Sequence, residues 1–408
     1  MNELLTVAQV ADMLSVSKQT VISWDKRGKL KAERHPINNY RVYRRSNIEA
    51  ISLFPGDYIS EDQFTHLKPK KVVSCIELFA GAGGLALGFE KAGIKSTLLN
   101  EIDKYACATL RKNKPDWNVI EGDVAKIDFK DYKNKVDIVS GGFPCQTFSY
   151  AGKKMGMEDA RGTLFYEFAR CIKETNPKIA LGENVRGLLN HEGGKTLALM
   201  KEILDDLGYN VIEPKVLKAI NYRVPQKRER LFIVAIRKDL DIKFDFPKPF
   251  DTLYTIGDTL KAGRLFDTDV PDSLGQTYPE RKAEILSMVP QGGYWRDLPI
   301  DIQKEYMLKS YYLGGGKTGM ARRMSWDEPS LTLTCAPAQK QTERCHPEET
   351  RPFKVREYAR IQTFPDDWEF AGGPSQQYKQ IGNAVPVNLG YYVGQALVKA
   401  LNSFKEKK

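Results

Sequence analysis

The feature that most constrains the fold is an alternation of short apolar runs and amphipathic segments between Val72 and about residue 240. Runs such as "VVSCIELF", "VDIVSGGFP" and "IALGENV" have the length and composition of buried strands, whereas "KYACATLRKN" and "TLALMKEILDDLG" place apolar residues at helical spacing. Strands that alternate with helices form a mostly parallel sheet that is covered on both faces. The sequence therefore predicts an α/β domain whose ligand site lies at the carboxyl ends of the strands.

Residues 1–55 have a different pattern. Two short helical patterns are separated by "SVS", and a basic extended pair follows around the turn "INN". This order predicts a winged helix-turn-helix. The segment resembles the MerR and excisionase group through "LTVAQVADMLSVSKQTVISW" and "YRVYRRSNI", and that resemblance implies DNA binding. The alternative is a small helical domain that packs on another protein surface.

The rest of the chain divides by composition. Polar residues with Pro and Gly predict a linker at 56–71, and residues 72–240 with 375–408 form the expected α/β domain. Residues 241–374 are richer in Gly, Pro and aromatic residues, so we expect an irregular second lobe there. A chain of 408 residues that is 41% hydrophobic can bury the cores of two or three domains.

Composition also narrows the class of protein. The sequence has no run of 18 or more apolar residues and no signal-peptide pattern, so we expect a cytoplasmic protein without a membrane partner. The six cysteines lack metal-ligand spacing, which argues against a disulfide framework and against any metal. The net charge of +10 favours a polyanionic partner such as nucleic acid.

A glycine-rich turn follows the first predicted strand in "ELFAGAGGLALGFEKAG". Gly81, Gly83 and Ala86 fit the spacing G-x-G-x-x-G/A, and Glu101 ends the next strand 20 residues after Gly81. Such glycines let the backbone approach a ligand, and Glu101 can accept both hydroxyls of a ribose. Asp123 ends a third strand, where it can bind an adenine amino group. Together these residues predict an adenosine-containing ligand, although each alone is also compatible with an ordinary turn or a solvated acid.

The chemistry depends on what ends the later strands. In "GGFPCQTFS" Pro144 turns the chain just before Cys145, and Glu183 ends the next strand in "GENV". A nucleophilic cysteine needs a polar or cationic site that lowers its pKa; otherwise Cys145 is a packing thiol. In "VPQKRERLF" the residues Gln226, Arg228 and Arg230 alternate, so on a strand they share one face.

Residues 72–408 resemble bacterial DNA (cytosine-5)-methyltransferases of restriction-modification systems. The blocks that carry the resemblance are "FAGAGG", "NEID", "GDV", "GGFPCQTFS", "GENV", "QKRERL" and "QIGNAVPVN". It implies a Rossmann-like domain that binds S-adenosylmethionine (SAM), a target-recognition domain over 241–374, and methyl transfer to C5 of a flipped-out cytosine in double-stranded DNA. It further implies that Cys145 attacks C6, Glu183 hydrogen-bonds N3 and the amino group, Arg230 contacts O2, and Arg228 supports Glu183 or a phosphate.

The resemblance also assigns binding residues. For SAM they are Phe79, Gly81, Gly83, Gly84, Glu101, Ile102, Asp123, Phe143, Leu164 and Asn383. For DNA we expect contacts from Gln146, Ser149, Gln226, Arg322 and Arg323. The glycine-containing segment after Cys145 is either a lid over the flipped base or a plain surface loop.

The same resemblance implies partners and leaves alternative functions open. We expect a monomer that protects host DNA from a separately encoded restriction endonuclease, with autoregulation through the helix-turn-helix. One alternative is a DNA-binding transcriptional regulator. Another is a tRNA cytosine-5 methyltransferase, which keeps the chemistry and changes the polymer.

Overall fold

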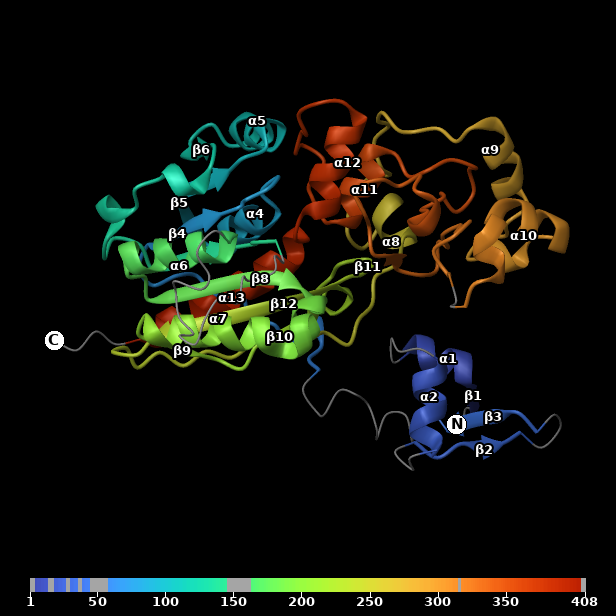
Figure 1. Ribbon diagram of the computed structural model, residues 1–408, viewed down its shortest axis with the longest axis horizontal. Helices are drawn as coiled ribbons and strands as arrows, with labels where there is room; N and C mark the ends of the chain where they lie inside the picture. Colours follow the sequence, from blue (N-terminus) through green and yellow to red (C-terminus); the bar gives the residue numbers. More distant parts are fainter. Residues whose placement is uncertain are drawn as a thin grey trace. The chain divides into compact units, whose positions relative to one another are not determined.

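The computed structural model describes residues 4–13, 18–26, 30–35, 39–44, 58–144, 163–314 and 317–404. The chain forms two compact units, Met1–Ser60 and Glu61–Lys408 (Figure 1).

The first unit is a small winged helix-turn-helix, as predicted. Its elements are β1 (Leu4–Thr6), α1 (Val7–Met13), α2 (Lys18–Lys26), β2 (Glu33–Arg34) and β3 (Arg41–Arg44). The strands form an antiparallel sheet in the order β1-β3-β2. Apolar residues of both helices and of the sheet share one core, formed by Leu5, Val10, Ala11, Val21, Leu30 and Tyr43. Two wing arginines are paired with acids, Arg41 with Asp25 and Arg44 with Glu33.

The second unit is built on one large sheet with the strand order β10-β12-β8-β7-β4-β5-β6. The strands are β4 (Val73–Leu78), β5 (Ile94–Glu101), β6 (Val119–Glu121), β7 (Ile138–Gly141), β8 (Ile179–Val185), β9 (Tyr209–Val211), β10 (Lys215–Lys218) and β12 (Glu229–Arg237). The five neighbouring strands at one end of this order are parallel to one another: β8, β7, β4, β5 and β6. Strand β12 is antiparallel to β8, β9 and β10. The chain runs outward from β4 through β5 to β6 and returns to β7, so the strand order reverses beside β4, which is where α/β sheets bind ligands.

Helices cover both faces of this sheet, which confirms the predicted α/β class. They are α4 (Gly84–Lys91), α5 (Lys104–Asn113), α6 (Leu164–Thr175), α7 (Lys195–Asp206) and α13 (Val387–Ser403). Helices α4 and α5 contribute to one core with the start of α13, and α6 and α7 contribute to the other. None of the helices in the described ranges is long and apolar enough to cross a bilayer.

The irregular lobe has two separate cores. Its helices are α8 (Gly257–Leu260), α9 (Glu280–Ser287), α10 (Ile300–Met307), α11 (Val355–Ile361) and α12 (Pro374–Asn383). Buried residues between Tyr278 and Cys345 form a core of their own. Residues of α8, α11 and α12 instead share a core with α4 and α5. The expected domain boundary at residue 374 therefore divides a single core, because α11 packs on the same side as α12.

The segment from Glu61 to Lys71, which we expected to be linker, lies against α13. The Phe64 ring packs edge-on against Tyr392 with 5.0 Å between ring centroids. The Leu67 amide donates to Gln395 Oε1 over 2.7 Å, and further along the amide of Lys70 donates to Asn402. The polar composition of this stretch hid the half-buried Phe64, whose packing, together with the paired backbone amides, holds the segment on the helix.

Candidate active site

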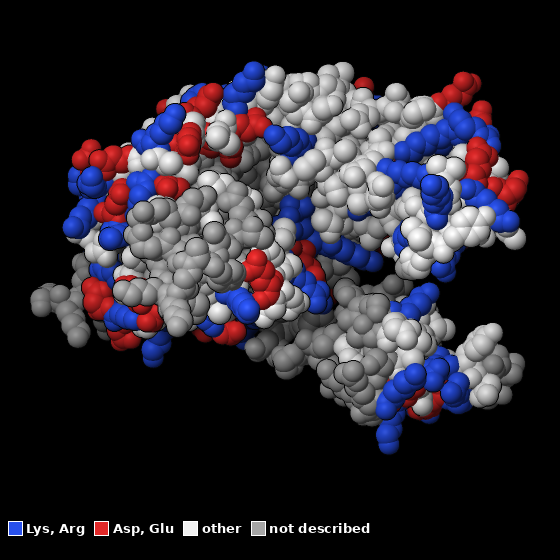
Figure 2. Space-filling view, viewed as in Figure 1, with Lys and Arg blue, Asp and Glu red and all other residues white. Residues whose placement is uncertain are grey.

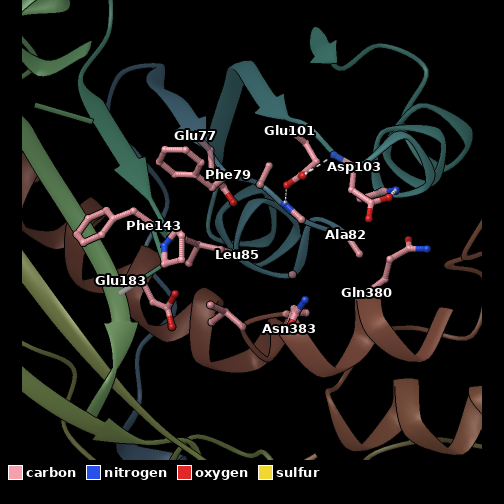
Figure 3. Close-up of a pocket in the computed structure, with 18 of the residues that line it drawn as sticks. Glu77, Phe79, Ala82, Leu85, Glu101, Asp103, Phe143, Glu183, Gln380 and Asn383 are labelled. Carbon is pink, nitrogen blue, oxygen red and sulfur yellow. Dashed lines mark hydrogen bonds between the residues drawn. The ribbon is translucent and has the colours of Figure 1, made fainter. Parts of the chain in front are cut away.

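A cavity of about 630 Å³ opens at the carboxyl ends of β4, β5, β7 and β8, next to α12 (Figure 3). The sequence predicted a ligand site at the carboxyl ends of the strands, and the structure adds that this site lies where the strand order reverses. The expected SAM residues that line it are Phe79, Gly81, Gly84, Glu101, Ile102, Phe143 and Asn383. Glu183 and Arg230 line the same cavity, so the predicted cofactor motif and the predicted acid share one space.

The glycine-rich turn between β4 and α4 depends on its glycines in two different ways. Gly81 has a positive φ of 55°, and a Cβ placed there would meet no atom within 4 Å, so conformation alone requires it. A Cβ on Gly84 would lie 2.1 Å from the carbonyl oxygen of Val385, so close packing requires that glycine. Gly83 does not line the cavity; a Cβ there would collide with Leu110 of α5.

Glu101 ends β5 and fixes the turn. One carboxylate oxygen accepts the amide of Gly81 over 2.7 Å, and the other accepts the amides of Ile102 and Asp103 over 2.8 Å each. Ile102 is 71% exposed and lines the cavity, so it offers an apolar surface to a ligand. Lone pairs that remain on Glu101 can accept hydroxyl groups.

Besides Gly83, two expected cofactor residues, Asp123 and Leu164, are not among the lining residues. Asp123 follows β6, and its carboxylate caps the short 3₁₀ turn Val124–Lys126 by accepting the amide of Ala125 over 3.0 Å. Leu164 opens α6 and packs against the core on the α6 and α7 side. Their predicted contacts with SAM therefore stay predictions.

Glu183 and Arg230 form a buried ion pair at the inner wall. Arg230 Nε lies 2.8 Å from Glu183 Oε1. In the antiparallel pairing of β8 and β12, Glu183 is opposite Phe232 and Arg230 is opposite Val185, so the two charged residues are diagonal neighbours on one face. Burial raises the pKa of Glu183, and the charges of Arg230 and Arg228 oppose that rise. Such a carboxyl group can hold a proton and donate it in a hydrogen bond.

Gln226 does not have its predicted role, and Arg228 keeps only part of its own. Gln226 lies in β11 (Gln226–Lys227), which pairs with β13 (Ser330–Leu331) and not with the large sheet. Its fully buried side chain bonds Gln362 and the amide of Leu333, so a DNA contact there is wrong.

Arg228 is 1% exposed and donates to the carbonyl oxygens of Leu333 and Gly382 over 3.3 and 3.0 Å. A phosphate cannot reach it. Arg228 supports Glu183 only through its positive charge, which opposes the rise in the pKa of that acid. The residue that contacts Glu183 directly is Arg230, which we had expected to contact the base oxygen. Irregular backbone inside a lobe leaves carbonyl groups that need donors, and an arginine supplies several.

Arg323, predicted to touch DNA, is also structural. It is 4% exposed and donates to the carbonyl oxygens of Leu286 and Val289 over 2.8 Å each, so that prediction is wrong for the same physical reason. The mostly buried side chain of Arg322 lies 3.6 Å from Glu328. On the face shown in Figure 2, exposed basic and acidic side chains are interspersed.

The predicted nucleophile and two predicted DNA contacts, Cys145, Gln146 and Ser149, lie outside the described residues, as does the proposed lid. The described chain leads up to them: Phe143 and Pro144 line the cavity. The carbonyl oxygen of Phe143 accepts a hydrogen bond from the side-chain amide of Asn184 over 2.7 Å, which joins the segment after β7 to β8.

Sequence reasoning missed several lining residues, among them Glu77, Asp103, Asn184 and Lys379. Glu77 could have been found, because it is the single charged residue in the strand "VSCIEL". Lys379, from α12, pairs with Asp103 over 2.8 Å. That contact brings together residues almost 280 positions apart, which no local pattern reports.

The sheet and its cavity define the class: this is the fold of SAM-dependent methyltransferases. The S. pombe Dnmt2 methyltransferase matches with a TM-score of 0.57 and 18% identity over 81% of this chain and 99% of that one. The Entamoeba histolytica methyltransferase EhMeth matches with a TM-score of 0.54 and 17% identity over 81% and 98%. At these identities the likeness concerns the fold.

Sequence comparison then gives the family. The family description "C-5 cytosine-specific DNA methylase" matches residues 73–399, and "MerR family regulatory protein" matches residues 6–43. The chain belongs to the C-5 cytosine-specific DNA methylase family and carries a MerR-like unit at its N-terminus.

Curated relatives agree over the whole length. Type II methyltransferase M.Eco47II of Escherichia coli is 62% identical over 413 aligned residues, covering 100% of this chain and 98% of that protein. Type II methyltransferase M.PspPI of Psychrobacter sp. (strain TA137) is 59% identical over 98% and 96%. M.Sau96I of Staphylococcus aureus is 48% identical over 98% and 89%. The chain is a Type II DNA (cytosine-5)-methyltransferase.

Proposed function

We propose that the cavity binds SAM and that the enzyme methylates C5 of a cytosine flipped out of a short specific duplex sequence. The observation that carries this proposal is that the Glu101 turn and the Glu183–Arg230 pair line the same cavity. Its volume of about 630 Å³ is in the range of cofactor sites. Glu101 would hold the ribose, Ile102 the adenine face, and Asn383 the methionine end.

On the base side, the residues of this chain supply nucleophile and acid. The Cys145 thiolate forms a bond to C6 while Glu183 gives a proton to N3, so that C5 gains the electron density of an enamine. When bound, SAM supplies the methyl group that C5 accepts. The C5 proton then leaves to solvent, the bond between Cys145 and C6 breaks, and N3 returns its proton to Glu183. Arg230 holds Glu183 in place throughout.

The DNA must be deformed for this chemistry, because C6 of a paired base is not accessible. Flipping the base costs a few kcal/mol, which contacts to phosphates offset. We assign the reading of sequence to the lobe around α9 and α10 and the covering of the flipped base to the segment after Cys145. Biologically, the enzyme would act in the cytoplasm as a monomer that protects DNA from a separately encoded endonuclease.

The test is transfer of labelled methyl groups from SAM to duplex DNA. We expect Cys145→Ser to bind DNA but transfer nothing, and the matched variant Cys335→Ser, which removes an exposed thiol, to retain transfer. Full activity of Cys145→Ser would refute the mechanism. A parallel reaction with tRNA tests the RNA alternative, and bisulfite sequencing of DNA from expressing cells identifies the methylated cytosine and its context.

We further propose that the first unit binds a promoter, including that of its own gene. The winged fold and the MerR match over residues 6–43 support this second role. Deletion of residues 1–60 separates it from catalysis. Loss of promoter binding with methylation intact is the expected result; loss of methylation as well would mean that this unit holds the substrate.

A further inference from the structure

Glu77 is a buried acid of the cavity that the proposed reaction does not use. It is 4% exposed, lies on β4 two residues before Phe79, and lines the cavity wall that also carries Glu101 and Glu183 (Figure 3). Among the described residues, none donates a hydrogen bond to its carboxyl group or forms an ion pair with it. Burying such a group without a partner is costly, so its retention points to a ligand.

The charged groups around Glu77 leave it without compensation. The other charged residues that line the cavity are Glu101, Asp103, Glu183, Arg230 and Lys379. Both cations are committed, Arg230 to Glu183 and Lys379 to Asp103, each over 2.8 Å. Burial, and then repulsion from Glu183 and Glu101, raises the pKa of Glu77 to about 8. A bound cation would reverse this situation by favouring the ionised carboxylate.

We propose that Glu77 is the residue by which the cavity prefers a sulfonium methyl donor to its neutral thioether product. This inference rests on the proposed binding of SAM. SAM and S-adenosylhomocysteine (SAH) share adenosine, amino and carboxylate groups and differ in one methyl group and one positive charge. When SAM binds, Glu77 releases a proton to solvent and faces the sulfonium as a carboxylate. After methyl transfer that charge is gone, Glu77 takes a proton from solvent, and the product is held less tightly.

The experiment measures the dissociation constants of SAM and SAH for the full chain by calorimetry at pH 6.5 and pH 9. The ratio of the two constants cancels most of what the shared ligand groups contribute, and comparison with a Glu77 variant removes the effect of the sulfonium on the amino group of SAM itself. In the wild type we expect the preference for SAM to rise about tenfold between the two pH values, a change of about 1.4 kcal/mol. Glu77→Gln should show a preference about tenfold weaker than wild type at pH 9 and a much weaker pH dependence. Asp206→Asn, the control, removes an exposed acid of α7 that does not line the cavity and should keep the wild-type ratio.

A Glu77→Gln enzyme that keeps the wild-type preference and its pH dependence overturns the inference. If that variant does not melt cooperatively, proton release in the wild type decides the matter. At pH 7.5, calorimetry in buffers of different ionisation enthalpy should show more protons released with SAM than with SAH, and equal release overturns the inference. Failure of the wild type to bind either ligand would instead overturn the proposed cofactor.

Discussion

Replacing Arg230 by methionine should destabilise the second unit by about 3 kcal/mol, because it leaves Glu183 buried without its partner. The pair is 2.8 Å apart and each side chain is 12% exposed, so water cannot replace the lost contact. The double variant Glu183→Gln with Arg230→Met should recover most of the loss, because no buried charge then remains uncompensated. An exposed pair gives the control: Arg281→Met, which breaks a contact with Glu305, should leave the free energy of unfolding almost unchanged, because solvent screens both charges.

The loss should also depend on pH with a definite sign. Burial already raises the pKa of Glu183, and removal of Arg230 raises it further. An acid whose folded-state pKa is raised favours the folded state below its unfolded-state pKa, and that advantage is lost as pH rises through the folded-state value. The variant should therefore approach wild-type stability near pH 5 and fall below it at pH 8. Urea unfolding followed by tryptophan fluorescence measures this, since four of the five tryptophans lie in the second unit. A loss that is equal at both pH values, or that the double variant does not reduce, would refute the reasoning.

Three other substitutions test the site and its surroundings. Gly84→Ala should lower the thermal midpoint and weaken SAM binding at least tenfold, because its methyl group would displace the segment at Val385; calorimetry and melting curves measure both. Glu101→Gln should weaken SAM binding about tenfold while the fold persists, since an amide oxygen can replace only part of its three backbone contacts; unchanged affinity would remove Glu101 from the ribose site. Arg323→Met should destabilise the protein by about 2 kcal/mol or more yet leave the methylated sequence unchanged in bisulfite sequencing; a changed sequence would restore its role in DNA reading.

The parts that the sequence predicted well are those governed by periodicity. Buried parallel strands are apolar throughout, so their ends are visible, and Glu101 and Glu183 could be placed at one edge of the sheet before the structure was known. The winged unit was visible for a similar reason, because its helices and strands are short and separated by clear turns.

The roles of the arginines could not be predicted, because they depend on contacts between distant segments. Alternation placed Arg228 and Arg230 on one face, but the chain leaves β11 before it enters β12, and the two side chains find different partners. No sequence pattern near Arg228 indicates that the carbonyl oxygens of Leu333 and Gly382 need a hydrogen-bond donor. Arg323 was misassigned for the same reason: a basic residue in an irregular lobe serves the backbone as readily as DNA.

The closure of the glycine turn by the segment around Val385 has a consequence for biosynthesis. One wall of the cavity, from Lys379 to Val385, comes about 300 residues after the turn that it closes, which begins near residue 79. The last strand of the sheet ends at Arg237, and a ribosome adds roughly 5–20 residues per second, so the sheet has about seven seconds or more to form before that wall emerges. The nascent enzyme thus has no complete cofactor site until residues 379–385 have emerged, and a chain terminated before them would lack that wall altogether.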